Sequence, residues 1–299
     1  MKMFTDVPLP PPFRVGEFEI RRIVEMRCHF RRLEKMFPLA TQDEIEGLLP
    51  DLQPWCVDDE TRIIVDIQSY LVRTPHHTIL LDTCIGCDKN NQRIPMWHRL
   101  TDRGWFDRLG QAGVTPEQVT HVLCTHLHPD HAGWNTQLID GRWVPTFPNA
   151  KYIFARDEVD HCKTHEEEIY QDSVLPVIAA GQAELVDMDH QIEDGIWLEP
   201  TPGHTSGHVA IHLQSGQENA IMWGDLLHSP AQCAYPHWSY VRDITPEDSV
   251  ASRRRVLEAC VEQNHLVLSS HFPGPSTGRI HTTETAFSFT YEDREGGAV

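Results

Sequence analysis

The segment His126–His131 has the sequence HLHPDH and places four potential metal ligands within six residues. It follows a run, residues 120–125, whose apolar and β-branched content predicts a buried strand. Imidazole nitrogens and carboxylate oxygens suit zinc and its neighbours in the first transition row. Because ligands this close together must be held on one short loop, the segment predicts a metal site.

Three later features could complete this site, and each lies where an expected strand runs out into a loop. His204 stands in residues 201–208, where proline and glycine hold an irregular turn that lets a histidine point away from the sheet. Asp225 follows the apolar run 220–223 through a glycine, and His271 precedes another turn rich in proline and glycine. Each feature is weak alone, but their joint occurrence downstream of HLHPDH favours one shared site.

The elements that must position these residues alternate between strands and helices. Mixed apolar alternation and short apolar runs predict strands at residues 16–26, 61–73, 78–82, 121–125, 152–155, 183–186, 196–199, 208–213 and 220–223. Apolar residues at helical spacing predict helices at residues 100–112, 156–163, 167–180 and 246–264. The chain is therefore expected to be α/β with much antiparallel sheet. Without a linker or repeat, we expect a single domain over residues 1–299, with residues 1–15 as an extended N-terminal arm.

Composition limits the partners. The formal net charge of −19 stays strongly acidic even with two bound divalent cations, so nucleic acid and anionic membrane surfaces would be repelled. Small neutral or cationic substrates are favoured. The N-terminus lacks the apolar core of a signal peptide, and no run approaches the roughly 20 apolar residues of a membrane span. We expect a cytoplasmic protein whose eight cysteines are free thiols.

Two further motifs are interpreted as structural. Cys84 and Cys87 form a Cys-x-x-Cys pair, but no second pair completes a zinc site, and the helix start usual for a redox dithiol is missing. The basic triplet at residues 253–255 lies on an expected helix and is interpreted as a solvated face. Neither motif is expected to take part in chemistry.

HLHPDH followed in order by His204, Asp225 and His271 resembles the metallo-β-lactamase superfamily, over about residues 16–290. The resemblance implies an α/β (α+β) fold, a four-layer αβ/βα sandwich with the metals at one sheet edge. It also implies a dinuclear ligand set, with Asp225 bridging both ions, His126, His128 and His204 on the first, and Asp130, His131 and His271 on the second. Asp82 is similar to the family's early strand-end aspartate, which supports the histidine loop, although a turn cap is the alternative.

Such a centre implies hydrolysis. Two divalent ions roughly 3.5 to 4 Å apart need a bridging carboxylate and a bridging hydroxide to offset their mutual repulsion. The hydroxide forms at neutral pH because a metal-bound water ionises near a pKa of about 7. Asp130 is placed to orient that hydroxide and to carry a proton to the leaving group. Zinc is expected, and manganese, cobalt or iron compete for the same ligands.

Some residues of this chain differ from those of other branches of the superfamily, and the differences exclude several reactions. Asp225 argues against β-lactam hydrolysis, because the di-zinc β-lactamases lack the bridging aspartate, and His128 stands where flavin-linked di-iron members carry glutamate. The N-terminal arm and residues 223–228 resemble the branch that holds quorum-quenching lactonases and methyl parathion hydrolase. Many acyl-homoserine lactonases have a tyrosine three residues after the bridging aspartate. This chain has His228 there, a candidate hydrogen-bond donor or acid.

Three functional classes stay open. The leading prediction is a dinuclear metal-dependent hydrolase of small carboxylic esters or lactones, with phosphotriester cleavage as a close alternative. The second is a mononuclear iron enzyme of the persulfide dioxygenase type, and the third is a metal-stabilised binding or scaffold protein without turnover. Trp134, Tyr235 and Trp238 are predicted to line the substrate pocket, since aromatic side chains can hold an apolar ester body. The resemblance also implies a homodimer, with the N-terminal arm as the first candidate contact.

Overall fold

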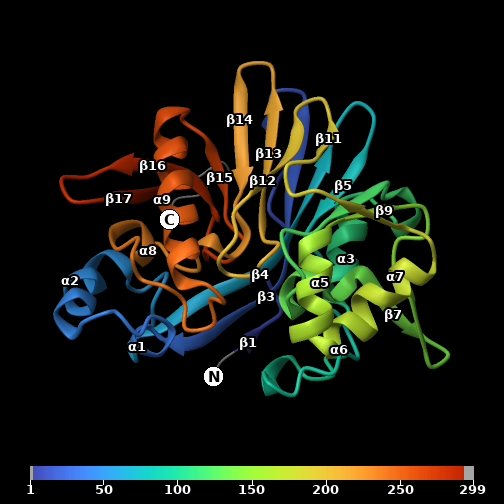
Figure 1. Ribbon diagram of the computed structural model, residues 1–299, viewed down its shortest axis with the longest axis horizontal. Helices are drawn as coiled ribbons and strands as arrows, with labels where there is room; N and C mark the ends of the chain where they lie inside the picture. The colour runs from blue at the N-terminus through green and yellow to red at the C-terminus, as the bar shows by residue number, and fades with distance from the viewer. Residues whose placement is uncertain (1–2, 293–299) are drawn as a thin grey trace.

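Two β-sheets lie against each other at the centre of the molecule, with helices outside them (Figure 1). The computed structural model describes residues 3–292 of the chain. The first sheet has the order β1-β3-β4-β5-β6-β9-β10, with β2 also paired to β3, and the second has the order β11 to β17. In Figure 1, α3, α5, α6 and α7 lie on one side of the sheets and α8 and α9 on the other. This is the αβ/βα sandwich that the sequence resemblance implied.

The first sheet is mixed. β3 and β4 pair over a long antiparallel ladder, and β5, β6, β9 and β10 continue in parallel. Its strands are β1 (Met3–Phe4), β2 (Phe13–Val15), β3 (Phe18–Arg32), β4 (Arg62–Arg73), β5 (Thr78–Leu81), β6 (His121–Leu123), β9 (Lys151–Ala155) and β10 (Ala183–Val186). A separate hairpin joins β7 (Thr136–Ile139) to β8 (Arg142–Pro145).

The second sheet is antiparallel except for the parallel pair β14 and β15. Its strands are β11 (Gln191–Glu193), β12 (Ile196–Pro200), β13 (Val209–Ser215), β14 (Glu218–Met222), β15 (Leu266–Leu268), β16 (Thr277–Thr282) and β17 (Phe287–Tyr291). The sequence prediction found β12 to β14 and the strand end before His271, which is that of β15, but it missed β11, β16 and β17.

The helices and helical turns occupy the connections. The α-helices are α1 (Leu33–Met36), α2 (Gln42–Leu52), α3 (Gly104–Gln111), α4 (Pro129–Ala132), α5 (Arg156–His165), α6 (Glu167–Ile169), α7 (Leu175–Ala179), α8 (Ala231–Ala234) and α9 (Pro246–Glu262). Between them lie the 3-10 turns η1 (Pro95–Trp97), η2 (Pro116–Gln118), η3 (Gly133–Asn135) and η5 (Gly224–Leu226), and the π-helical turn η4 (Tyr170–Val174). Among the described residues, no helix is long and apolar enough to cross a membrane.

The helix expected over residues 167–180 is interrupted by η4, and Pro176 gives the reason. A proline has no N–H to donate to the carbonyl four residues before it, which here belongs to Asp172. That carbonyl instead accepts hydrogen bonds from the Thr136 hydroxyl and from Lys89 Nζ. The interruption thereby ties this helical segment to the hairpin and to the residues after β5.

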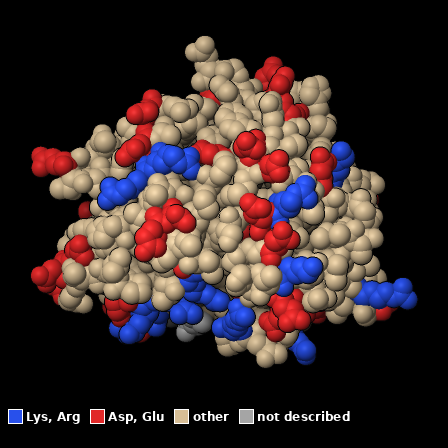
Figure 2. Space-filling view, in the orientation of Figure 1, with Lys and Arg blue, Asp and Glu red and all other residues tan. Residues whose placement is uncertain are grey.

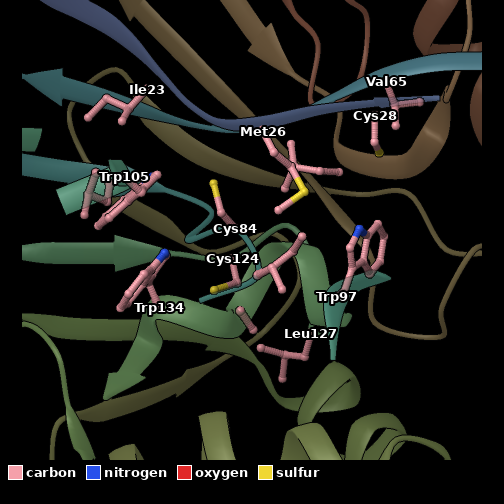
Figure 3. Packing of buried hydrophobic residues seen from close by; sticks show 14 of the residues in the cluster. Ile23, Met26, Cys28, Val65, Cys84, Trp97, Trp105, Cys124, Leu127 and Trp134 are labelled. Carbon is pink, nitrogen blue, oxygen red and sulfur yellow. The ribbon is translucent and has the colours of Figure 1, made fainter. Parts of the chain in front are cut away.

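Three apolar clusters follow the four layers. One lies between the two sheets, with Val72 and Leu123 facing Leu198 and Ile211. A second packs the first sheet against its helices, and a third packs the second sheet against α9. Figure 3 shows part of the second cluster, where Cys84 and Cys124 lie among large apolar side chains. All eight cysteines are free and buried, as the sequence predicted.

Surface charge is mixed on the face seen in Figure 2, where acidic and basic side chains are interspersed. The basic triplet at residues 253–255 is only partly on the surface. Arg253 is fully buried, and its guanidinium donates to the carbonyls of Leu226, Pro236 and Trp238. The expectation of a solvated face is therefore wrong for Arg253, which holds together the loop that follows Asp225.

Candidate metal centre

The seven predicted ligands meet beyond the ends of four strands. One group comes from the loop after β6, His204 from the turn between β12 and β13, Asp225 from the end of β14 and His271 from the end of β15. The structure gathers them in two sets whose ligand atoms lie within 4.8 Å of one another. These are His126, His128, His204 and Asp225, and Asp130, His131 and His271. The sequence therefore found residues that lie together in the fold.

The first set has the spacing of ligands that share one ion. Nδ1 of His128 lies 3.0 Å from Nε2 of His126 and 3.0 Å from Nε2 of His204. Asp225 Oδ2 lies 3.7 Å and 3.3 Å from the same two Nε2 atoms. Ligand atoms held tetrahedrally at about 2.0 to 2.1 Å from zinc are roughly 3.3 Å apart. The distances therefore fit a single four-ligand site.

The second set uses the other oxygen of the same carboxylate. Asp225 Oδ1 lies 3.0 Å from His131 Nε2 and 2.8 Å from His271 Nε2. Asp130 Oδ2 lies 3.8 Å and 3.7 Å from these two nitrogens. The two oxygens of Asp225 are thus divided between the two sets, which is the arrangement of a bridging carboxylate.

Unsatisfied buried atoms at this point fit bound cations. His131 Nε2 and Asp225 Oδ1 are buried and lie 3.0 Å apart, but neither makes a hydrogen bond of suitable geometry with the described residues. Such groups are costly to bury, so natural proteins almost always supply a partner. Burial lowers the pKa of His126 and of His128 well below the usual value, which leaves neutral imidazoles suited to ligation, whereas, against the effect of burial, the charge of Asp225 raises the pKa of His131. The donor set therefore fits two divalent metal ions.

Hydrogen bonds behind the histidines fix which nitrogen faces the centre. Nδ1 lies 2.7 Å from Asp82 Oδ2 in His131, 2.9 Å from Asp243 Oδ1 in His204 and 3.1 Å from the Asp66 carbonyl in His271. Each acceptor holds an Nδ1–H, so the Nε2 lone pair is left for a metal. Asp82 also accepts from the Thr125 amide at 2.7 Å. The prediction that Asp82 supports the histidine loop is confirmed.

Glu158 on α5 joins two of the ligand loops. One carboxylate oxygen accepts from the Leu127 amide at 2.8 Å, and the other accepts from the Thr205 hydroxyl at 2.6 Å and the Gly207 amide at 3.2 Å. Burial raises the pKa of Glu158, although these hydrogen bonds act in the opposite direction. Sequence reasoning missed this residue because nothing near Glu158 in the chain marks it as a partner of both loops.

Two side chains lie so close to the backbone before Asp225 that only glycine fits at position 224. Gly224 has a positive φ of 56°, and a Cβ atom there would lie 2.6 Å from His208 Nε2 and 2.8 Å from a Thr125 side-chain atom. The Asp225 amide donates to the same His208 nitrogen at 3.0 Å. Only glycine leaves room for this turn, which aims the carboxylate at the centre.

A cavity of about 390 Å³ opens onto the ligands. Its metal-side wall includes His128, Asp130, His204, Asp225, His228 and His271, and its apolar lining includes Phe30, Val65, Ile67, Ile94 and Trp97. The buried His228 ring has its centroid 4.4 Å from that of Tyr240, and its Nε2 lies 3.1 Å from Asp225 Oδ2. Both predicted catalytic residues, Asp130 and His228, therefore border the cavity.

The three aromatic residues predicted to line the pocket lie elsewhere. Trp134 is buried in the first half of the sandwich, stacked on Trp105, and its Nε1 donates to Glu25 at 2.7 Å (Figure 3). Trp238 is buried against Phe37, and the half-buried Tyr235 stacks on Trp238. None of the three is among the cavity-lining residues. The pocket prediction needs correction, because η3 and the turn after α8 direct these rings into the core.

Comparison with known proteins agrees with this arrangement. A family model described as the metallo-beta-lactamase superfamily matches residues 64–260. An N-acyl homoserine lactonase from Bacillus thuringiensis is 23% identical over 243 residues, which cover 75% of this chain and 83% of the relative. Another from a Bacillus species is 27% identical over the same coverage.

Two solved structures share the fold over nearly the whole chain. AidC, a dizinc quorum-quenching lactonase solved with a product, superposes with a TM-score of 0.79 at 22% identity, over 95% of this chain and 97% of AidC. The hydrolase AbOPH superposes with a TM-score of 0.81 at 22% identity, over 96% of this chain and 100% of AbOPH. At this identity the likeness establishes the fold.

Proposed function

The chain belongs to the metallo-β-lactamase superfamily and is a metal-dependent hydrolase, and from that premise we propose that it hydrolyses small lactones or carboxylic esters with two zinc ions. The observation that carries this proposal is the division of the two Asp225 oxygens between two ligand sets. A mononuclear iron enzyme needs only the first set, and a scaffold protein needs no cavity beside it. The complete second set and the cavity therefore favour dinuclear hydrolysis.

When bound, the two ions supply a hydroxide nucleophile and polarise the carbonyl group under attack. Asp130 has one oxygen directed toward His131 and His271 and also borders the cavity. It is therefore placed to accept a proton at a carboxylate oxygen and to return that proton to the leaving alkoxide. The neighbouring apolar lining excludes water from the acyl or alcohol part of the substrate.

His228 takes the position of the tyrosine found in many acyl-homoserine lactonases. Its ring borders the cavity between Asp225 and Tyr240. Its Nδ1 has no hydrogen-bond partner among the described residues, and its Nε2 lies 3.1 Å from Asp225 Oδ2 but not in hydrogen-bond geometry. We assign it the role of donating an N–H to an oxygen of the substrate, which stabilises the charge that develops there.

A substrate screen tests this function. The zinc-loaded full chain would be assayed against neutral lactones, aryl carboxylic esters and organophosphate triesters, and its metal content measured. We expect about two ions per chain and specificity constants at least ten-fold higher for a lactone or carboxylic ester than for the triesters. A preference for the triesters would establish the alternative, phosphotriester hydrolysis. One iron per chain with sulfur-dependent oxygen uptake would overturn both.

Other expectations remain predictions. The single domain over residues 1–299, the homodimer contact through the arm at residues 1–15 and the cytoplasmic location each require their own measurement. Light scattering of the full chain, with and without residues 1–15, addresses the dimer directly.

A further inference from the structure

Arg242 places a positive charge on the cavity wall. Its half-buried side chain lines the same cavity as His204 and His228, and it makes no hydrogen bond or ion pair with the residues that the structure describes. The other arginine of the cavity, Arg93, is already bound, because its guanidinium donates to both carboxylate oxygens of Glu166 at 3.1 and 3.2 Å. Arg242 is therefore free to bind a ligand.

The backbone that carries Arg242 is held in place by the metal centre. The Asp243 amide donates to the Tyr240 carbonyl at 2.9 Å, and the Tyr240 amide donates to Asp243 Oδ2 at 3.0 Å, so residues 240–243 form a closed turn. Asp243 also holds His204 through its other oxygen, and the Val241 amide donates to the Met36 carbonyl. Arg242 is thus presented to the cavity from a turn fixed at both ends.

Tyr240 lines the same cavity as Arg242 and packs against two histidines of the metal side. Its ring centroid lies 5.7 Å from that of His204 and 4.4 Å from that of His228. A substrate carbonyl at the metals and a second group at Arg242 would therefore share one cavity, with the Tyr240 ring on its wall.

We propose that Arg242 binds a carboxylate on the substrate, so that the preferred substrates are lactones or esters that carry a free carboxylate besides the bond to be cleaved. This inference rests on the proposed function. A guanidinium offers a planar fork of donors that matches a carboxylate, and partial burial strengthens the attraction relative to bulk water. The sequence had favoured neutral or cationic substrates from the net charge of −19, but the unpaired cation inside the cavity acts at much shorter range.

A pair of nearly isosteric substrates tests the proposal. A γ-lactone that carries a carboxylic acid would be compared with the same lactone as its primary carboxamide, using the metal-loaded full chain. We expect the wild type to have a specificity constant at least ten-fold higher for the carboxylate, mainly through a lower KM. Arg242→Gln should reduce this ratio to about one, and Arg242→Lys should retain an intermediate ratio, because lysine keeps the charge without the fork.

Arg254→Gln is the matched control, because it removes the same charge from an exposed position on α9. It should keep the wild-type ratio. A wild-type ratio near one, or equal losses for both substrates in Arg242→Gln with metal content and circular dichroism unchanged, would overturn the role of Arg242. The two failures are distinguishable. Hydrolysis of neutral lactones without a carboxylate preference defeats this inference alone, whereas no hydrolysis of any lactone or ester defeats the proposed function.

Discussion

The two walls of the cavity are built in different ways. The metal-side wall consists largely of buried side chains, and the histidines that face it are fixed by partners such as Asp82 and Asp243. The opposite wall, residues 91–97 and 166–169, is largely exposed at its rim, where Arg93 and Glu166 form an ion pair. The contrast indicates that the reaction depends on a buried hydrogen-bond network, whereas the opposite wall contributes, together with Arg242, to the choice of substrate. Four predictions test this division, from the largest expected effect to the smallest.

Asp225→Ala should have the largest effect, because it removes the carboxylate that both ligand sets share. We expect the specificity constant to fall on the order of a thousandfold or more, with bound metal reduced from about two ions per chain to one or fewer. Steady-state kinetics and elemental analysis measure the two quantities. Asp189→Ala, an exposed aspartate after β10, serves as control and should change neither. Full metal content in Asp225→Ala would show that the carboxylate does not bridge.

Lys89 is a buried cation two residues before the wall segment 91–97, and it tests whether the region of the opposite wall also depends on a buried charge. Its ammonium is fully buried, donates to Thr136 Oγ1 at 2.6 Å and lies 3.5 Å from Asp172 Oδ1. Burial lowers the pKa of Lys89 from its ordinary value of 10.5 to about 8, against the opposing effect of Asp172. The unfolded chain therefore binds more protons between pH 8 and 10.5, so this group makes the folded state more stable as the pH rises through that window.

Lys89→Met removes that dependence. Between about pH 8 and 10.5, the free energy of unfolding of the wild type should increase by about 3 kcal/mol relative to the variant. Burial raises the pKa of thiols such as Cys84 and Cys124, so in this range they titrate only in the unfolded chain, equally in both proteins, and the difference between the two stabilities isolates Lys89. Urea unfolding at several pH values in this range measures it. A constant difference across the range would contradict a buried, perturbed lysine.

Asp243→Asn should have a smaller effect on chemistry, because it disturbs a ligand without removing one. The amide cannot accept from both the Tyr240 N–H and His204 Nδ1 as the carboxylate does. We expect a loss of 10- to 100-fold in metal affinity or activity, the range typical of groups behind a metal ligand. Competition with a chelator measures the affinity, and Asp189→Asn is the control. Unchanged affinity would mean that His204 is oriented by packing alone.

The sequence predicted the ligands but, of the residues that support them, only Asp82. Ligands such as His126 and Asp225 stand in loops after apolar strands, where proline, glycine and polar residues break the local pattern. Glu158 and Asp243 carry no such signal, because each meets its partner only across the fold. Asp82 was found through the family resemblance, not through its neighbours in the chain.

The direction in which some side chains point was the second feature that the sequence did not predict. Trp134 follows the ligand loop directly, but the ring turns into the core, where Glu25 accepts its N–H. Arg253 was interpreted from the sequence as a surface charge, but in the structure its guanidinium donates to three carbonyl groups. Both errors concern the direction in which a side chain points, which depends on neighbours far away in sequence. Apolar periodicity is local, so it predicted many of the strands and helices, whereas the four-layer arrangement was implied by the family resemblance.

Glu166→Gln should have the smallest effect and tests the division most directly. The Arg93–Glu166 pair is largely exposed on the arginine side, at 61%, and such pairs typically contribute less than about 1 kcal/mol. We expect metal content to stay at the wild-type value and specificity constants to change by less than about three-fold, with larger changes for bulky substrates than for small ones. Arg93→Gln should have the same effect, and the double variant should add little, since either change breaks the pair. If Glu166→Gln instead lowered metal content, the two walls would be coupled, and substrate choice could not vary independently of the metal centre.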